Sequence, residues 1–102
     1  MALQEEDMLV NIRMNGTEIL EGEQEKALQT LRKAAWFIET TQQHIEKDLY
    51  AKVTEGERTL FQTMIEELTT HALELGIDNG RIVEVIQAGM RYAEMEWVLR
   101  HV

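Results

Sequence analysis

The stretch Thr54–Arg100, TEGERTLFQTMIEELTTHALELGIDNGRIVEVIQAGMRYAEMEWVLR, decides the fold. It opens with a Thr-x-x-Glu capping box, in which Thr54 and Glu57 each cap the backbone N–H of the other at a helix N-terminus. Apolar residues then recur at helical spacing, as expected of a helix that buries one face. They are Phe61, Met64, Ile65, Leu68, Ala72 and Leu75.

A tight turn follows this helix. Gly76 is typical of a helix C-cap, and Ile77 is placed to make the apolar contact that accompanies such a cap. Asp78 or Asn79 is the expected N-cap of a further helix that runs to about Arg100. Because a short connection makes neighbouring helices antiparallel, the two helices should pack side by side.

A third helix is predicted before this pair, from about Glu23 to Lys52. Its apolar residues follow heptad spacing, and Gln42 interrupts the row. The row comprises Leu28, Leu31, Ala35, Ile38, Ile45 and Leu49. The sequence therefore predicts a single mainly α domain over residues 1–102, with an antiparallel three-helix bundle in residues 23–102.

Residues 1–22 form an acidic segment with two alternative interpretations. Val10, Ile12 and Met14 alternate with polar residues, and Asn15-Gly16 follows them. Asn-Gly between alternating apolar residues favours a short β-hairpin, because a type I′ turn needs positive φ at both positions. The alternative is a short N-terminal helix from about residue 3 to 14, ended by Asn15-Gly16 as a C-cap, which would make the chain all-α.

The helix that ends near Arg100 carries more apolar surface than a bundle needs. One row comprises Ile82, Ile86, Gly89, Met90, Ala93 and Trp97. A second row, about 120° away by helical geometry, comprises Val85, Ala88, Tyr92, Met95 and Leu99. A helix that is apolar on two sides is buried on two sides, and the bundle covers only one. Gly89 would let another backbone approach closely.

Two aromatic residues of the 23–52 helix, Trp36 and Phe37, point away from its own apolar row. Apolar patches of this kind tend to mark contacts. Together with the second row they make the predicted interaction residues: Trp36, Phe37, Val85, Ala88, Tyr92, Met95 and Leu99. The N-terminal segment could cover both surfaces and leave a monomer, or cover one and leave the other to a second chain. A second copy is expected there rather than a different protein, since twofold dimers are the commonest closed assemblies.

Composition excludes several classes of function. The 102 residues contain no Cys, so disulfides and thiolate chemistry are excluded, and the absence of Ser excludes a Ser nucleophile. A net charge of -9 argues against binding to nucleic acid or to an anionic membrane through a basic face. No apolar run approaches the roughly 20 residues of a membrane span, and the acidic N-terminus is unlike a signal peptide, so a cytoplasmic protein is expected.

No catalytic, cofactor-binding or metal-binding residues are predicted. His44 and Asp48 stand four residues apart, as do Glu67 and His71, but the folded bundle should keep these two pairs too far apart to share an ion. We therefore expect a non-catalytic regulatory or protein–protein interaction module, homodimeric through its last helix and binding a further protein.

Two alternative functions are weighed against this one. The first is an acidic inhibitor or nucleic-acid mimic, of the kind carried by phages, that occupies a basic site on a partner. Its acidic surface would comprise Glu5, Glu6, Asp7, Glu18, Glu21, Glu23 and Glu25. The second is a small helical enzyme whose reaction cannot be named, because function must be argued from a site.

Overall fold

The computed structural model describes residues 5–102, with side chains from Glu21 onward. Its elements, in chain order, are α1 (Glu5–Gln43), the short π-helical turn η1 (His44–Asp48), α2 (Glu55–Glu74) and α3 (Asn79–Arg100). No strand occurs among residues 21–102. The prediction of a mainly α chain with three helices is therefore confirmed. The hairpin predicted within residues 1–22 and its helical alternative lie outside the residues described in full, and both stay predictions.

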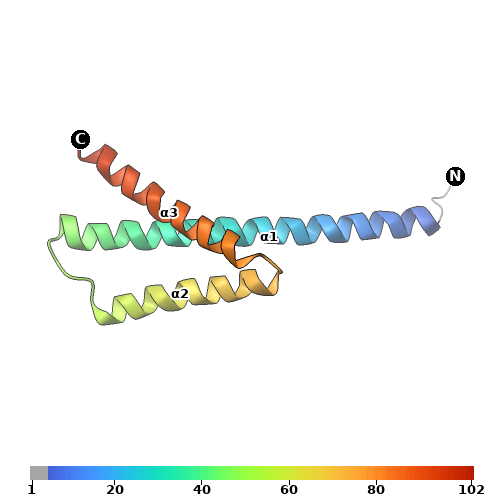
Figure 1. Cartoon of the computed structure of the whole chain (residues 1–102), viewed down its shortest axis with the longest axis horizontal. Coiled ribbons are helices and arrows are strands. Elements are labelled where there is room, and N and C mark those ends of the chain that lie inside the picture. The colour runs from blue at the N-terminus through green and yellow to red at the C-terminus, as the bar shows by residue number, and fades with distance from the viewer. Residues whose placement is uncertain (1–4) are drawn as a thin grey trace.

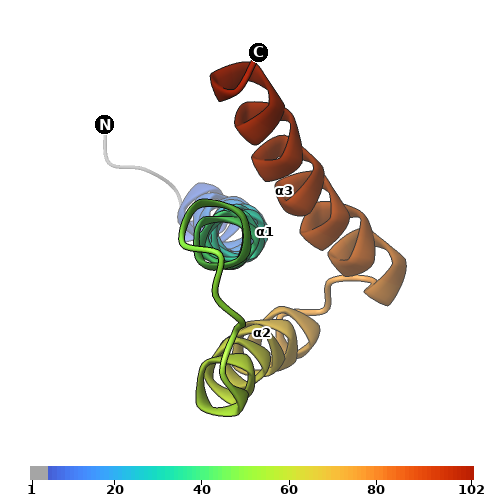
Figure 2. The same cartoon turned by 90° about the vertical axis from the view of Figure 1, so that its left-hand side faces the viewer.

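Helix α1 contacts both of the other helices. Figure 1 shows α2 running back antiparallel to α1, and α3 crossing α1 obliquely. Seen along α1, the two later helices lie on different sides of it and diverge from their shared turn (Figure 2). The contact of α3 with α1 is the most extensive, and that between α2 and α3 is the least. This arrangement is more open than the closed bundle expected from the helical patterns.

The N-terminus of α2 is capped as the sequence predicts. The Thr54 hydroxyl accepts a bond from the Glu57 backbone N–H, and the Glu57 carboxylate accepts one from the Thr54 N–H, each at 3.1 Å. Two donors that an N-terminus leaves unpaired are thereby satisfied. The Thr54 hydroxyl also donates to the Glu57 carboxylate at 2.7 Å, and this bond, followed by the bond from the Thr54 N–H, holds the pKa of Glu57 below its ordinary value because both stabilise the charged carboxylate.

The turn between α2 and α3 is also fixed by local chemistry. Gly76 has a φ of 83°, a left-handed conformation that glycine adopts without steric cost. The N–H groups of Gly76 and Ile77 then return to the carbonyls of Leu73 and Ala72, at 2.9 and 3.1 Å. This pattern closes a glycine C-cap. The Asp78 carboxylate caps α3 by accepting from the Gly80 N–H at 3.0 Å.

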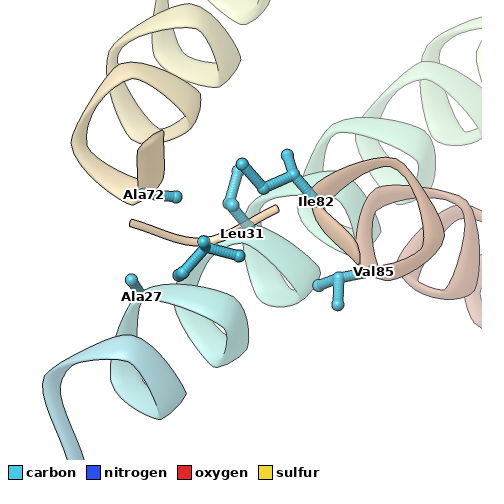
Figure 3. Close-up of a cluster of buried hydrophobic side chains, with 6 residues drawn as sticks. Ala27, Leu31, Ala72, Ile82 and Val85 are labelled. Atoms are coloured by element: carbon cyan, nitrogen blue, oxygen red, sulfur yellow. The ribbon is translucent and has the colours of Figure 1, made fainter. Parts of the chain in front are cut away.

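The core lies where this turn meets α1. Leu31 of α1 is completely buried at its centre, and side chains from α2, α3 and the turn surround it (Figure 3). The buried cluster comprises Ala27, Leu31, Ala72, Ile77, Ile82 and Val85. Gln24 ties α1 to the same place, because its side-chain amide donates to the Leu75 carbonyl at the end of α2, at 2.7 Å.

Gly89 allows α3 to cross α1 at close range. A Cβ at this position would lie 2.3 Å from the Arg32 carbonyl oxygen and 3.0 Å from the Ala35 Cβ, well inside normal contact. The close backbone approach inferred from the sequence therefore occurs, and α1 of the same chain is the partner.

The first helix ends earlier than its apolar row predicts. The Leu49 N–H bonds to the His44 carbonyl, five residues back, at 3.0 Å, and this widens the last turn. Tyr50 then takes a left-handed φ of 52°, which ends the helix before the predicted boundary at Lys52. Leu49, expected in the apolar row, is consequently exposed.

Candidate interaction surface

Most of the second apolar row of α3 is exposed. The exposed fractions are 49% for Tyr92, 51% for Met95 and 68% for Leu99, and Ala88 is exposed as well. We call these four residues the α3 face. Val85, the remaining member of the row, is buried against the core cluster. The row is thus covered at its N-terminal end by the chain itself and open over the rest.

Trp36 is joined to the edge of the α3 face. Its indole N–H donates to the carboxylate of Glu96, and both side chains are half-buried. Glu96 lies one turn from Tyr92 and from Leu99 along the helix, so Trp36 reaches α3 on the flank that carries the α3 face. The bond explains how an acidic residue can sit between two apolar rows.

Phe37 lies elsewhere. It is 49% exposed and follows Trp36 directly, so helical geometry turns it about 100° around α1 from that residue. The interaction residues predicted from the sequence therefore do not form one surface: Trp36 and the α3 face are brought to the same side, Phe37 is separate, and Val85 is in the core.

The predicted acidic surface is described only in part. Glu21, Glu23 and Glu25 are all exposed on α1. The other four residues of that set, Glu5, Glu6, Asp7 and Glu18, lie outside the residues whose side chains are described. Their role stays a prediction.

One cluster of side chains was not predicted from the sequence. The carboxylate of Asp48, in η1, lies between two histidine rings. Its Oδ2 is 3.0 Å from Nδ1 of His44, and its Oδ1 is 3.5 Å from Nε2 of His101, which follows the last residue of α3. The His101 ring stacks on Trp97, and the Lys47 ammonium lies 4.1 Å from the centre of the Trp97 ring. The spacing of His44 and Asp48 was visible in the sequence, but nothing local indicated that His101 would join them.

Two carboxyl groups along α1 and η1 have shifted pKa values of opposite sign. Burial, and after it repulsion from Glu94, raises the pKa of Glu39 above its ordinary value. The hydrogen bond from His44 holds the pKa of Asp48 below its ordinary value, and His101 adds to this effect. Glu39 therefore resists ionisation in the folded chain, whereas Asp48 is held as the anion.

Several open hollows occur on the surface of residues 21–102. One lies beside the Asp48 cluster and is lined by Glu46, Lys47, Asp48, Tyr50, Trp97 and His101. A smaller apolar groove opens where α2 and α3 diverge over α1, lined in part by Ile38, Ile65 and Met90. Within the described part of the chain, no group of three or more His, Cys, Asp or Glu side chains is arranged to hold a metal ion.

Comparison of the chain with protein-family models, curated proteins and solved structures found no match. Among the helices searched in the described residues, none combines the length and apolar character that crossing a membrane requires.

Proposed function

We propose that this protein is a non-catalytic helical interaction module that pairs with a second copy of itself through the α3 face. The observation that carries the proposal is the exposure of Tyr92, Met95 and Leu99 in one row. Contiguous exposed apolar patches on small domains are typical of contact surfaces, whereas single exposed apolar residues need no explanation.

The spacing of the row favours a helix as the partner. Ala88, Tyr92, Met95 and Leu99 are separated by four, three and four residues. This alternation keeps a seam facing a second helix that lies nearly alongside, with side chains of one helix between those of the other. In a homodimer that second helix is α3 of the other copy, which carries the same row.

Charges at the borders of the row suit a parallel pair of α3 helices. Arg91 precedes Tyr92, and Glu96 follows Met95, so the two residues border the seam on opposite sides. Such flanking positions face each other across a parallel helix pair. Arg91 of each copy would then lie opposite Glu96 of the other, which gives two equivalent attractive contacts.

The size of the core supports the need for a partner. Within residues 21–102, ten apolar residues are buried and four of them are alanines, whereas twelve large apolar residues are exposed. Six of those twelve belong to α3, and three of the six, Tyr92, Met95 and Leu99, lie in the α3 face. Covering this exposed apolar surface would stabilise the assembly by about 25 cal/mol for each Å² removed from water.

The test is the mass in solution of the full chain, measured by light scattering after size exclusion. We expect about 24 kDa, twice the chain mass of 11.9 kDa. Tyr92→Glu combined with Leu99→Glu should give a folded species of half that mass, because paired copies would bury four added carboxylates without partners. Leu60→Glu is the matched control, since Leu60 is 60% exposed on α2, and it should leave the mass unchanged.

A wild-type chain that runs as a monomer at all concentrations would overturn the proposal. So would a double variant that stays dimeric. Circular dichroism separates these results from unfolding: if the double variant lost its helical signal, Met95→Lys alone would serve as the milder change.

A further inference from the structure

The C-terminal end of α3 is attached to η1 by side chains rather than by backbone. His101 is the C-cap residue of α3, and its backbone N–H donates to the Val98 carbonyl at 3.1 Å. Its ring turns back onto the helix, stacks on Trp97 and faces Asp48. Two side-chain contacts therefore join η1 to the end of α3, the His101–Asp48 pair and the Lys47 ammonium over the Trp97 ring.

Each ring nitrogen of His101 faces an oxygen that can only accept. Nδ1 lies 2.7 Å from the Trp97 carbonyl oxygen, so this nitrogen must carry a proton. Nε2 lies 3.5 Å from Oδ1 of Asp48, whose carboxylate is held ionised. A neutral imidazole has one N–H and can satisfy only one of these acceptors, whereas the imidazolium satisfies both.

Among the surrounding charges, Asp48 is the anion that faces the His101 ring directly. His44 donates from Nδ1 to the other oxygen of Asp48 at 3.0 Å, a bond that its neutral form can make. The Lys47 ammonium lies over the same Trp97 ring and opposes a second positive charge, and Arg100 is adjacent in sequence. The remaining ionisable groups around the same hollow are the Glu46 carboxylate and the Tyr50 hydroxyl.

We propose that His101 is a proton-operated latch: protonated, it holds the last turn of α3 against η1, and neutral, it releases that turn. The neutral ring keeps its Nδ1 proton for the Trp97 carbonyl and presents an Nε2 lone pair to the Asp48 carboxylate, which is repulsive. Histidine is the side-chain type whose ordinary charge change falls between about pH 5 and pH 8, so the latch is tested on the two sides of that interval.

The latch is tested by nuclear magnetic resonance on the isotope-labelled full chain at about pH 5.5 and about pH 8, the two sides of the histidine range. We expect the ¹³Cα shifts of residues 97–101 to be helical at the lower pH and to move towards coil values at the higher pH. The Trp97 indole signal should move in the same transition, because its stacking on His101 is lost.

Two variants and one control identify the groups involved. His101→Gln and Asp48→Asn should both abolish the pH-dependent change, the first by removing the titrating ring and the second by removing the anion that favours its charge. His71→Gln, at an exposed histidine of α2, should leave the change intact. Identical ¹³Cα shifts at the two pH values would overturn the latch, as would a transition that persists in Asp48→Asn.

Discussion

The two ends of the second apolar row of α3 have opposite environments, whereas Ala93, in the first row, is still buried in the second half of the helix. In the first half, Ile82 and Val85 are buried beside Leu31 of α1. In the second half, Tyr92, Met95 and Leu99 repeat the spacing of Val85 but are exposed. The crossing at Gly89 separates the halves, because beyond it α3 moves away from α2 (Figure 2). Apolar periodicity thus predicts which face of a helix favours burial. The place where α3 crosses α1 determines which part of that face is buried within the chain.

The buried half should dominate the stability of the fold. Leu31→Ala removes the central side chain of the core cluster and leaves a cavity between three elements. We expect a loss of about 2–5 kcal/mol in the free energy of unfolding, measured by chemical denaturation. Leu60→Ala, at an exposed position of α2, should change stability by less than about 0.5 kcal/mol. Similar losses at both positions would mean that the cluster is not the core.

The crossing itself is tested by Gly89→Ala. Alanine is the better helix former by about 1 kcal/mol, but its Cβ would meet the Arg32 carbonyl oxygen at 2.3 Å and force the helices apart. We expect a net loss of about 1–3 kcal/mol. Gly56→Ala, where an added Cβ has nothing within 4 Å, should be neutral or stabilising. A stabilising Gly89→Ala would show that α3 does not cross α1 at this point.

The capping box that begins α2 should contribute less to the free energy of unfolding than the core cluster or the Gly89 crossing. Thr54→Ala removes the hydroxyl that caps the Glu57 N–H, and we expect a loss of about 1 kcal/mol in thermal or chemical unfolding. The pKa of Glu57 is lowered in the fold. The stability that its ionised carboxylate contributes is therefore present above the unfolded pKa and is lost as pH falls through the folded pKa. The effect of Thr54→Ala should therefore shrink in acid. Thr63→Ala, on the exposed face of α2, provides the comparison.

The smallest effect is expected at Glu39, on the α1 side of the crossing. Because its pKa is raised in the fold, ionisation of Glu39 costs stability as pH rises through the folded pKa. Glu39→Gln should therefore stabilise the chain at neutral pH by a few tenths of a kcal/mol, roughly what a partly exposed charge is worth. The gain should vanish below the ordinary glutamate value of 4.5. An equal gain from Glu67→Gln on α2 would point to net charge instead of the Glu39 site.

Signals that act within one or two turns were predictable. The capping box at Thr54, the glycine C-cap at Gly76 and the Asp78 N-cap are all present as the sequence indicates. Each depends on bonds between residues two to five positions apart, so the local sequence contains both partners. The end of the first helix was misplaced, because the widened turn at Leu49 and the left-handed Tyr50 leave no mark on apolar periodicity.

The candidate surface was predictable only in part. The exposed Tyr92, Met95 and Leu99 follow from counting apolar faces, but the burial of Val85 and the separation of Phe37 from Trp36 do not. Trp36 pairs with Glu96 across 60 residues of sequence, and periodicity gives no information about contacts at that range.

The sequence by itself determined the three helices, both caps of α2, the N-cap of α3 and the presence of a surplus apolar face on α3, because hydrogen bonds and periodicity within a helix need only neighbouring residues. The tertiary structure alone decided that α3 crosses α1 at Gly89, that the surplus face stays open beyond that point, and that His101 meets Asp48. These features depend on the angle between two helices, which is set by packing among residues far apart in the chain.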